Sequence, residues 1–308
     1  MRPVYRRAPR AWNHHQWTAF AAAAFAVVLW GLLPLLRQQI AAVPPLLTAG
    51  LALGCAALVE TLRGWLASLA HRPTTGTVAG ASLPIGRGVV LSATLVGAIA
   101  FYFLGLDLAP AVPVTLVTYV WPLMFVAASE VLTLGRVRGV VLAGGAVAFA
   151  GTAVLVTGGD AATAVAAHGP GYAAGLASGV SWVVYSLALR RGPTLGPGAW
   201  PPLFTLAAVW AIGLHLAVEP AAGALTAGTL AVCAVIGAGP YGVAFVAWAY
   251  GVRCGPAHTV GTLAYAVPLV AAGALVALGG AELGWHLLVG GAAVLAGVAL
   301  ANRRTASA

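Results

Sequence analysis

Charge is scarce in this sequence. Only 7% of the 308 residues are Asp, Glu, Lys or Arg, and lysine does not occur at all. Hydrophobic residues make up 61% of the chain, and the mean hydropathy is +0.96. A soluble domain could not bury so much apolar surface, so we expect lipid to surround most of the chain.

The few basic residues do not indicate nucleic-acid binding. All fifteen are arginines, and they give a net charge of +9. On a soluble domain such an excess would suggest a phosphate-binding surface. Here the arginines stand between hydrophobic runs, where positive charge sets the orientation of membrane helices. We therefore expect a lipid bilayer and no nucleic acid among the partners.

Motifs for catalysis and metal binding are also lacking. The three cysteines (Cys55, Cys233 and Cys254) have no CxxC spacing, so we expect neither a metal site nor a redox site. The chain has no HExxH, no P-loop, no GxSxG on a strand and no acidic metal cluster. These absences predict no catalytic residue, no metal and no cofactor. The missing P-loop excludes ATP-driven transport by this chain alone.

Long hydrophobic runs dominate the chain instead. Each run is long enough, or nearly so, to cross a hydrocarbon core of about 30 Å. The first run follows four arginines but is too long for a typical signal peptide, so we expect it to be retained. The pattern predicts an all-α integral membrane protein with ten transmembrane helices, near residues 17–36, 44–62, 88–106, 111–134, 139–157, 171–190, 200–218, 227–251, 256–279 and 284–301.

The arginines predict the orientation. Fourteen of them fall in the two tails and in alternate connections, and only Arg37 falls on the other side. Ten helices with both termini in the cytoplasm satisfy this asymmetry. We expect a multi-pass protein of the bacterial inner membrane with cytoplasmic tails at 1–16 and 302–308. The connection from Arg63 to Arg87, rich in Ser, Thr, Pro and Gly, is predicted to be a loop.

An internal repeat divides the chain. Shifting the sequence by 146 residues aligns 105–153 with 251–299, with about sixteen identities in 49 positions. Each repeat contains five helices, which is an odd number, so the second copy must enter the membrane in the opposite orientation. We therefore predict two inverted five-helix units, at 17–157 and 171–301. Inverted repeats are typical of transporters, in which the substrate site lies near the membrane midplane.

Two prolines mark the expected midplane. Pro122 and Pro268 occupy equivalent positions in the repeat, halfway along their runs. A proline removes a backbone hydrogen bond and kinks a helix, and in lipid the freed carbonyl needs a partner or a polar cavity. The neighbouring Tyr119, Trp121 and Tyr265 are thus predicted to line a cavity, although a purely structural kink would leave the same pattern.

Aromatic residues away from the membrane interfaces are further candidates. Buried Tyr and Trp need hydrogen-bond partners that lipid cannot provide. Helical spacing puts Tyr241, Phe245 and Trp248 on one face, and also Ser178 with Trp182 and Tyr185. Helix packing produces the same spacing. The candidate substrate-binding residues are Trp30, Tyr102, Tyr119, Trp121, Trp182, Tyr185, Tyr241, Trp248 and Tyr265, with Thr115, Thr118 and Thr262 as further hydrogen-bonding groups.

Ionisable residues in the runs are few. Glu130 and His258 are the candidates for proton coupling, since a histidine titrates near physiological pH. Glu130 could instead pair with Arg136, and Glu60 with Arg63. A GxxxG stripe at Gly171, Gly175 and Gly179 predicts close helix packing.

The sequence resembles the drug/metabolite transporter superfamily, in its EamA-type ten-helix branch. The resemblance covers nearly the whole chain, including the two copies, the mid-run prolines and the glycine-rich fifth and tenth runs. Tyr119-Val120-Trp121-Pro122, Ser181-Trp182 and Leu29-Trp30-Gly31 are similar to segments of YddG-type amino-acid exporters. That resemblance implies a central cavity with Tyr119, Trp121 and Trp182 along the substrate route. The chain departs from the EamA pattern at Leu134-Gly135-Arg136, where Gly-Glu is usual.

The expected function is export of neutral (aromatic or hydrophobic) amino acids or similar small metabolites by a secondary transporter that works by alternating access. We expect a monomer. Efflux of organic cations is an alternative that would use the same aromatic surfaces, though no acid is expected at the midplane. A non-transporting scaffold or membrane enzyme is a third, which the inverted repeat disfavours.

Overall fold

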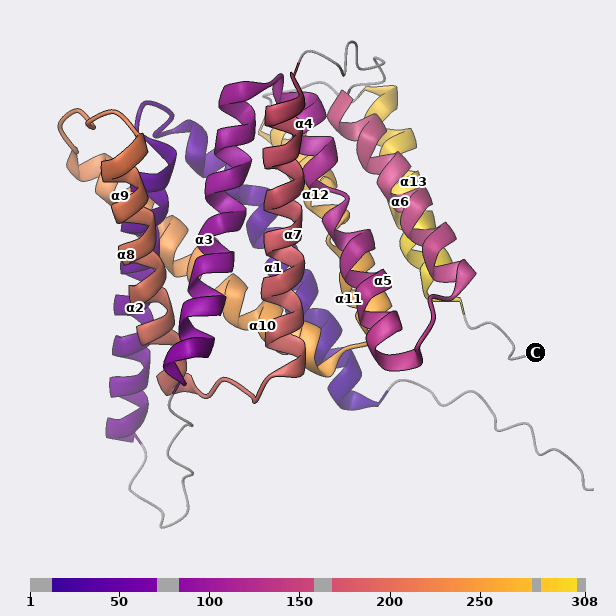
Figure 1. Ribbon diagram of the computed structural model, residues 1–308, viewed down its shortest axis with the longest axis horizontal. Coiled ribbons are helices and arrows are strands. Elements are labelled where there is room, and N and C mark those ends of the chain that lie inside the picture. Colours follow the sequence, from indigo (N-terminus) through magenta and orange to yellow (C-terminus); the bar gives the residue numbers. More distant parts are fainter. Residues whose placement is uncertain (1–12, 71–82, 158–167, 279–283, 304–308) are drawn as a thin grey trace, which may run out of the picture.

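The computed structural model describes residues 13–70, 83–157, 168–278 and 284–303. Within this part of the chain every regular element is a helix (Figure 1). The basic tail expected at 1–16 lies almost wholly outside the described residues, and the tail at 302–308 lies mostly outside them.

The described residues form two short helical turns and thirteen α-helices, which follow one another along the chain. Their bounds are α1 His14–Gln38, α2 Pro45–Ala70, α3 Ile85–Leu108, α4 Ala111–Thr118, α5 Trp121–Leu134, α6 Gly139–Thr157, α7 Gly169–Arg191, η2 Pro197–Ala199, α8 Trp200–Val218, α9 Ala227–Ala238, η3 Gly239–Val243, α10 Ala244–Cys254, α11 Ala257–Leu263, α12 Ala266–Ala277 and α13 Trp285–Ala301.

Eight helical segments of the described chain are long and apolar enough to cross a membrane. Five consist of α1, α2, α3, α7 and α8, the last with η2 at its start. The other three are composite: α4 with α5, α9 with η3 and α10, and α11 with α12. The apolar helices α6 and α13 are shorter. The protein is therefore a multi-pass helical membrane protein.

The predicted loop from Arg63 to Arg87 is too long at both ends. Helix α2 continues for two further turns beyond Arg63, to Ala70. Residues 63–70 contain no proline and several good helix formers, so the helix propagates past the charge at Arg63. Arg87 likewise lies inside α3 and not before it.

Two of the composite segments are interrupted just before a proline. The chain leaves the α-helix at Tyr119 and resumes it at Trp121, so that Pro122 occupies the first turn of α5. It leaves the helix again after Leu263 and resumes it at Ala266, two residues before Pro268. In each case the proline offers no N–H to the carbonyl four residues earlier.

A third interruption falls in the eighth hydrophobic run, where the sequence analysis had singled out no break. Gly239–Val243 form one turn of π-helix, in which the N–H of Ala244 bonds to the carbonyl of Gly239. Pro240 is the second residue of this turn, and single π-turns of this kind are frequent at functional sites. The wider turn changes the direction in which the side chains of α10 point.

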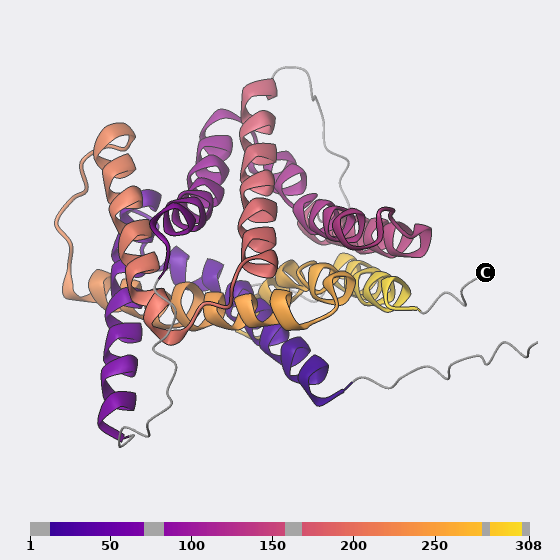
Figure 2. The same ribbon diagram turned by 60° about the horizontal axis from the view of Figure 1, so that its bottom comes forward.

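The helices α6 and α13 lie side by side at one edge of the molecule (Figures 1 and 2). Their glycines allow the backbones to touch. A Cβ on Gly151 would lie 2.7 Å from the carbonyl oxygen of Gly290, and one on Gly297 would lie 2.6 Å from that of Gly144. Gly144 and Gly151 are the residues that the 146-residue shift aligns with Gly290 and Gly297.

The glycine stripe of α7 packs closely, as predicted. A Cβ on Gly171 would lie 3.0 Å from the Ala109 nitrogen, and one on Gly175 or Gly179 would lie 3.1 or 3.0 Å from a carbonyl oxygen near α4. These contacts hold α7 against the ends of α3 and α4. They also bring the aromatic residues of α7 close to those of α5.

Candidate functional site

The two ends of the helix bundle carry opposite charge. At the first, which we call the arginine-rich end, are Arg87 on α3, Arg138 before α6, Arg190 on α7 and Arg253 on α10. At the other, which we call the acidic end, Asp107 ends α3 and Glu219 follows α8. The arginine-rich end is at the bottom of Figure 1.

A central cavity of about 260 Å³ lies among six of the helical segments. Pockets that hold drug-sized ligands have volumes of roughly 300–1,000 Å³, so a cavity of this size suits a smaller molecule. Its lining is mainly aromatic and aliphatic: Trp30, Leu33, Pro34, Ala98, Ile99, Tyr102, Phe103, Thr118, Tyr119, Trp121, Ser178, Trp182, Tyr241, Phe245, Ala264 and Val267.

Four tryptophans form a closed ring of contacts beside the cavity. Trp30 lies 5.7 Å from Trp182 and 5.3 Å from Trp248, measured between ring centroids. Trp121 lies 6.0 and 5.8 Å from the same two rings. The four side chains come from α1, α5, α7 and α10, so the ring joins helices that are far apart in the sequence.

Trp30 is held in place by the π-turn. Its indole N–H donates a 2.9 Å hydrogen bond to the carbonyl oxygen of Pro240. A buried indole N–H needs such a partner. Phe245 packs against the same ring at 5.6 Å and also against Trp182 at 5.9 Å. The irregular backbone of η3 therefore positions a cavity wall.

Several polar groups of the lining are already hydrogen-bonded within the protein. Ser178 donates to the carbonyl of Ala98 at 2.6 Å, and Thr118 donates to that of Gly175 at 3.1 Å. The Tyr102 hydroxyl is 2.9 Å from the hydroxyl of Thr115. None of the described residues that line the cavity is charged. Such a site favours a molecule without net charge over an ion, because no fixed charge would compensate the ion's desolvation.

Six of the nine sequence-predicted substrate residues line this cavity: Trp30, Tyr102, Tyr119, Trp121, Trp182 and Tyr241. Trp248 and Tyr185 are fully buried behind it, where Trp248 completes the tryptophan ring and Tyr185 lies 6.0 Å from Trp182. Tyr265 lies in a separate buried cluster with Phe149.

Several lining residues could not be identified from the sequence. Phe103 and the aliphatic residues of α1, α3 and α12 carry no signal that distinguishes them from residues facing lipid. Phe245 shared a helical face with Tyr241 and Trp248, and that spacing could have placed it in the candidate set. Pro240 offered a clearer signal, because a proline inside a long hydrophobic run indicates a local break.

Helices α7 and α10 cap each other at the arginine-rich end. Arg190 of α7 donates hydrogen bonds to the carbonyls of Val252 and Gly255, where α10 ends. Arg253 of α10 donates to the carbonyls of Leu189 and Gly192, where α7 ends. The last carbonyls of a helix lack intrahelical partners and carry its negative dipole end, so each arginine stabilises the opposite helix terminus.

The two candidate coupling residues, Glu130 and His258, both contact Arg138 and not the expected Arg136. Glu130 pairs with Arg138, which bonds to it through its guanidinium and its backbone N–H. Arg138 also lies 3.3 Å from the ring of His258. The expected partner, Arg136, is exposed. Gly135 turns the chain with a positive φ of 70°, which directs the second arginine back toward α5.

Two further acids have defined partners. Glu60 pairs with Arg63 on α2, as predicted. Glu219 binds the ring of His215 at 2.9 Å and accepts the backbone N–H of Leu46 at 2.8 Å. Glu219 therefore caps the start of α2, where an acid is favoured by the helix dipole.

Apolar spanning helices around an aromatic-lined central cavity are typical of membrane transporters. The EamA-like transporter family matches residues 170–303. A curated relative from Ancylobacter novellus, the aromatic amino acid exporter YddG, is 35% identical over 282 residues, which cover 87% of this chain and 93% of the relative. The chain therefore belongs to the EamA-like transporters, among the relatives of that exporter.

The fold also matches a solved structure. A crystal structure of a protein that is 31% identical in sequence superimposes with a TM-score of 0.82. The match covers 93% of this chain and 98% of the other. The similarity extends over the whole bundle and not only over the second half, where the family match lies.

Proposed function

We propose that the protein is a secondary exporter of neutral amino acids with aromatic or hydrophobic side chains, which it moves by alternating access through the central cavity. The observation that carries the proposal is the ring of four tryptophans beside a cavity without a charged lining residue. Aromatic rings at such distances provide an apolar surface for a flat or branched side chain. The name of the Ancylobacter novellus relative supports the same substrate class.

The proposed topology has ten spans, with α6 and α13 as the fifth and tenth. The arginine-rich end faces the cytoplasm, as positive charge does in membrane proteins, and both termini are then cytoplasmic. The bacterial relative makes the inner membrane the expected location. A monomer remains a prediction.

The proposed inverted repeats, 17–157 and 171–301, are supported by paired contacts. A Cβ on Gly145 would meet the Leu123 side chain at 2.6 Å, and one on Gly291 would meet the Leu269 side chain at 2.8 Å. The shift of 146 residues relates these two pairs. Equivalent residues in the two halves thus make equivalent contacts, as a pseudo-twofold axis requires.

Alternating access requires the cavity to close at one end at a time. Toward the arginine-rich end, Phe245 and Trp248, a member of the tryptophan ring, are buried, and the caps of Arg190 and Arg253 lie beyond them. We propose that α7 and α10 separate when the cavity opens to the cytoplasm. The breaks before Pro122 and Pro268 are the proposed hinges, since an interrupted helix can bend without losing further hydrogen bonds.

The direct test is efflux of labelled tryptophan, phenylalanine and methionine from proteoliposomes that contain the purified protein. We expect protein-dependent efflux of these substrates and slow efflux of glutamate and lysine. Trp182→Ala should lower the rate at least tenfold. Trp285→Ala is the matched control, because Trp285 on α13 is 59% exposed and outside the cavity. Equal rates for Trp182→Ala and the unaltered protein would refute the proposed substrate route.

A second candidate function is efflux of organic cations. The faces of Trp30, Trp121 and Trp182 would attract a cation. The lack of a charged lining residue disfavours it. Resistance of cells to quaternary ammonium compounds separates the candidates: a gain of resistance without amino-acid efflux would favour the cations.

The coupling mode is a separate proposal. The cluster of Glu130, Arg138 and His258 is the described group most suited to proton exchange, because it joins α5 to α11 at the arginine-rich end. Efflux from the proteoliposomes with and without a pH gradient tests it. Stimulation that is lost in His258→Gln supports proton coupling, whereas equal rates indicate facilitated export.

A further inference from the structure

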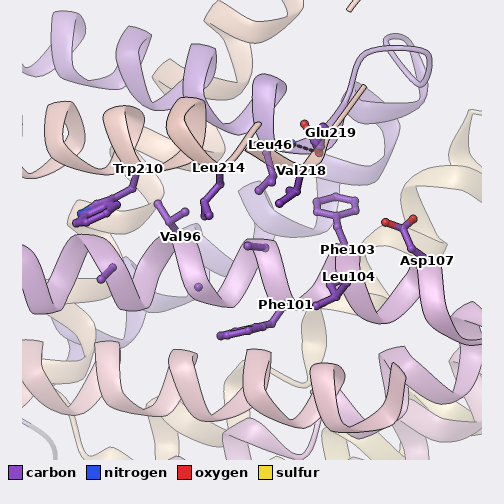
Figure 3. A pocket seen from close by; sticks show the side chains of 13 residues that line it. Leu46, Val96, Phe101, Phe103, Leu104, Asp107, Trp210, Leu214, Val218 and Glu219 are labelled. Carbon is purple, nitrogen blue, oxygen red and sulfur yellow. Dashed lines mark hydrogen bonds between the residues drawn. The ribbon is translucent and has the colours of Figure 1, made fainter. Parts of the chain in front are cut away.

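A second cavity lies outside the central one, in a groove between α3 and α8 (Figure 3). Its volume is about 460 Å³. Apart from two acids, the described residues that line it are apolar, among them Ala93, Ala100, Phe101, Phe103, Leu104 and Trp210. None of the amino-acid export residues named above belongs to this lining, apart from the shared wall residue Phe103.

The groove faces the surroundings of the bundle. Phe101, Leu104 and Trp210 are 41, 45 and 43% exposed, although all three are large and apolar. On a protein that spans a membrane, such a surface is in contact with lipid. From Ala93 to Asp107 the groove follows α3 for about 21 Å, at 1.5 Å per residue. One leaflet of a hydrocarbon core is about 15 Å thick, so the groove is long enough for one acyl chain.

The two acids lie together at one end of the groove (Figure 3). Glu219 is already bound by His215 and by the backbone N–H groups of Leu46 and Leu47. Asp107 is exposed, and its side chain has neither a hydrogen bond nor an ion pair with the described part of the chain. Asp107 is therefore the acid available to a ligand.

We propose that this groove binds an aminophospholipid, with one acyl chain between α3 and α8 and the primary ammonium of the headgroup on Asp107. An apolar channel with a free carboxylate at the level of the headgroups matches both parts of such a lipid. A primary ammonium can donate hydrogen bonds to the carboxylate, whereas the quaternary ammonium of a choline headgroup cannot.

Other occupants fit the groove less well. None of the described lining residues is basic, so nothing in the groove would neutralise the phosphate of an anionic lipid. A second copy of this chain, related by a twofold axis, would bring its own Asp107 and Glu219 near these two acids, and like charges at close range repel.

The bound lipid would support the central cavity. Phe103 borders both cavities, so an acyl chain in the groove packs on the outer side of a wall of the transport site. Without a chain there, Phe103 could move outward toward α8. The lipid site is thus distinct from the transport site but in contact with it.

Native mass spectrometry of the full-length protein, reconstituted with equal amounts of phosphatidylethanolamine, phosphatidylcholine and phosphatidylglycerol, tests the proposal. We expect one retained phosphatidylethanolamine, favoured at least threefold over phosphatidylcholine. Asp107→Asn should abolish the preference between these two lipids. Ala100→Trp, which fills the groove from α3, should reduce retention of all three. The exposed Ala292 on α13 provides the matched control, Ala292→Trp, which should behave as the unaltered protein.

A photo-crosslinking residue at Leu104 gives an independent readout that does not depend on the folding of the other variants. It should form an adduct with phosphatidylethanolamine in the membrane. Equal retention of the three lipids, a preference for phosphatidylglycerol, an unchanged preference in Asp107→Asn, or crosslinking to a second copy of the chain would each overturn the proposal.

Discussion

Arg190 and Arg253 exchange roles across the interface of α7 and α10, each donating hydrogen bonds to backbone carbonyls at the end of the other's helix. Neither arginine forms an ion pair with an acid among the described residues. The two helices therefore close the arginine-rich end through their own termini, with charge against dipole, and each helix loses a cap if they separate.

Removing either arginine should weaken this closure. A hydrogen bond to a charged group contributes about 1.5–3 kcal/mol, so we expect Arg190→Ala and Arg253→Ala each to lower the free energy of unfolding by about 2 kcal/mol. Thermal unfolding in detergent measures the change. Arg191→Ala is the control, since Arg191 is exposed and adjacent, and it should change stability by less than about 0.5 kcal/mol. Equal effects at 190 and 191 would contradict the reciprocal caps.

The hydrogen bond between Trp30 and the π-turn can be tested without removing the aromatic ring. Trp30→Phe deletes the indole N–H that binds the Pro240 carbonyl and should lower the free energy of unfolding by about 1 kcal/mol. Efflux of tryptophan should slow as well, because the cavity wall is no longer fixed. Trp285→Phe on the exposed face of α13 should affect neither measurement. Unchanged transport with lowered stability would restrict the bond to a structural role.

The hydroxyl of Tyr185 is buried and has no hydrogen-bond partner within the described residues. Leaving such a group unsatisfied costs about 1–3 kcal/mol, so Tyr185→Phe should raise the thermal stability. We expect the same substitution to slow transport, because the hydroxyl would be paired in the other state of the transport cycle. Tyr102→Phe is the comparison: it removes a satisfied hydroxyl and should lower stability. A Tyr185→Phe protein that is more stable and transports normally would exclude the hydroxyl from the cycle.

The partner of Glu130 distinguishes the structure from the sequence-based expectation. Arg138→Ala leaves a buried carboxylate without its partner and should cost about 3 kcal/mol of folding free energy. Arg136→Ala should cost less than about 0.5 kcal/mol, because Arg136 is exposed. Chemical or thermal unfolding of the two variants provides the comparison. A larger loss of stability in Arg136→Ala than in Arg138→Ala would favour the ion pair of Glu130 with Arg136 that the sequence suggested.

Gly151 and Gly139 lie on the same helix in different surroundings. A Cβ at Gly151 would press against the backbone of α13, so Gly151→Ala should destabilise the protein by about 1–3 kcal/mol. At Gly139 nothing lies within 4 Å, and alanine should be neutral or slightly stabilising. Thermal unfolding of the two variants measures both changes in stability. Equal effects at the two positions would contradict the assignment of the loss to the α6–α13 contact.

The helical content and most helix bounds could be predicted from the sequence because hydrophobic runs and breakers act locally. Close packing along the stripe of Gly171, Gly175 and Gly179 could be predicted for the same reason, since residues four apart share one face of a helix. The pairing of Glu60 with Arg63 also spans a single turn. The predicted end of α2 near Arg63 was wrong, because a charged residue at the end of a hydrophobic run does not by itself end a helix.

The candidate site could be predicted only in part. Six of the aromatic residues that the sequence singled out line one cavity, and their role in binding substrate stays a prediction. The exclusion of Tyr265 from the lining depends on how α11 and α12 are rotated after the break, which no spacing in the sequence indicates. The role of Pro240 depends on a carbonyl that meets Trp30 across 210 positions of sequence.

The long hydrophobic runs determined that this chain is a helical membrane protein, because a run of about twenty apolar residues satisfies its backbone hydrogen bonds in lipid by forming a helix. The distribution of arginine determined the expected orientation, and the repeat determined the expected architecture. Only the tertiary structure decided which side chains meet: the ring of four tryptophans, the exchanged caps of Arg190 and Arg253, the partner of Glu130 and the groove beside Asp107. These depend on the relative rotation and distance of separate helices, which packing sets and local sequence does not.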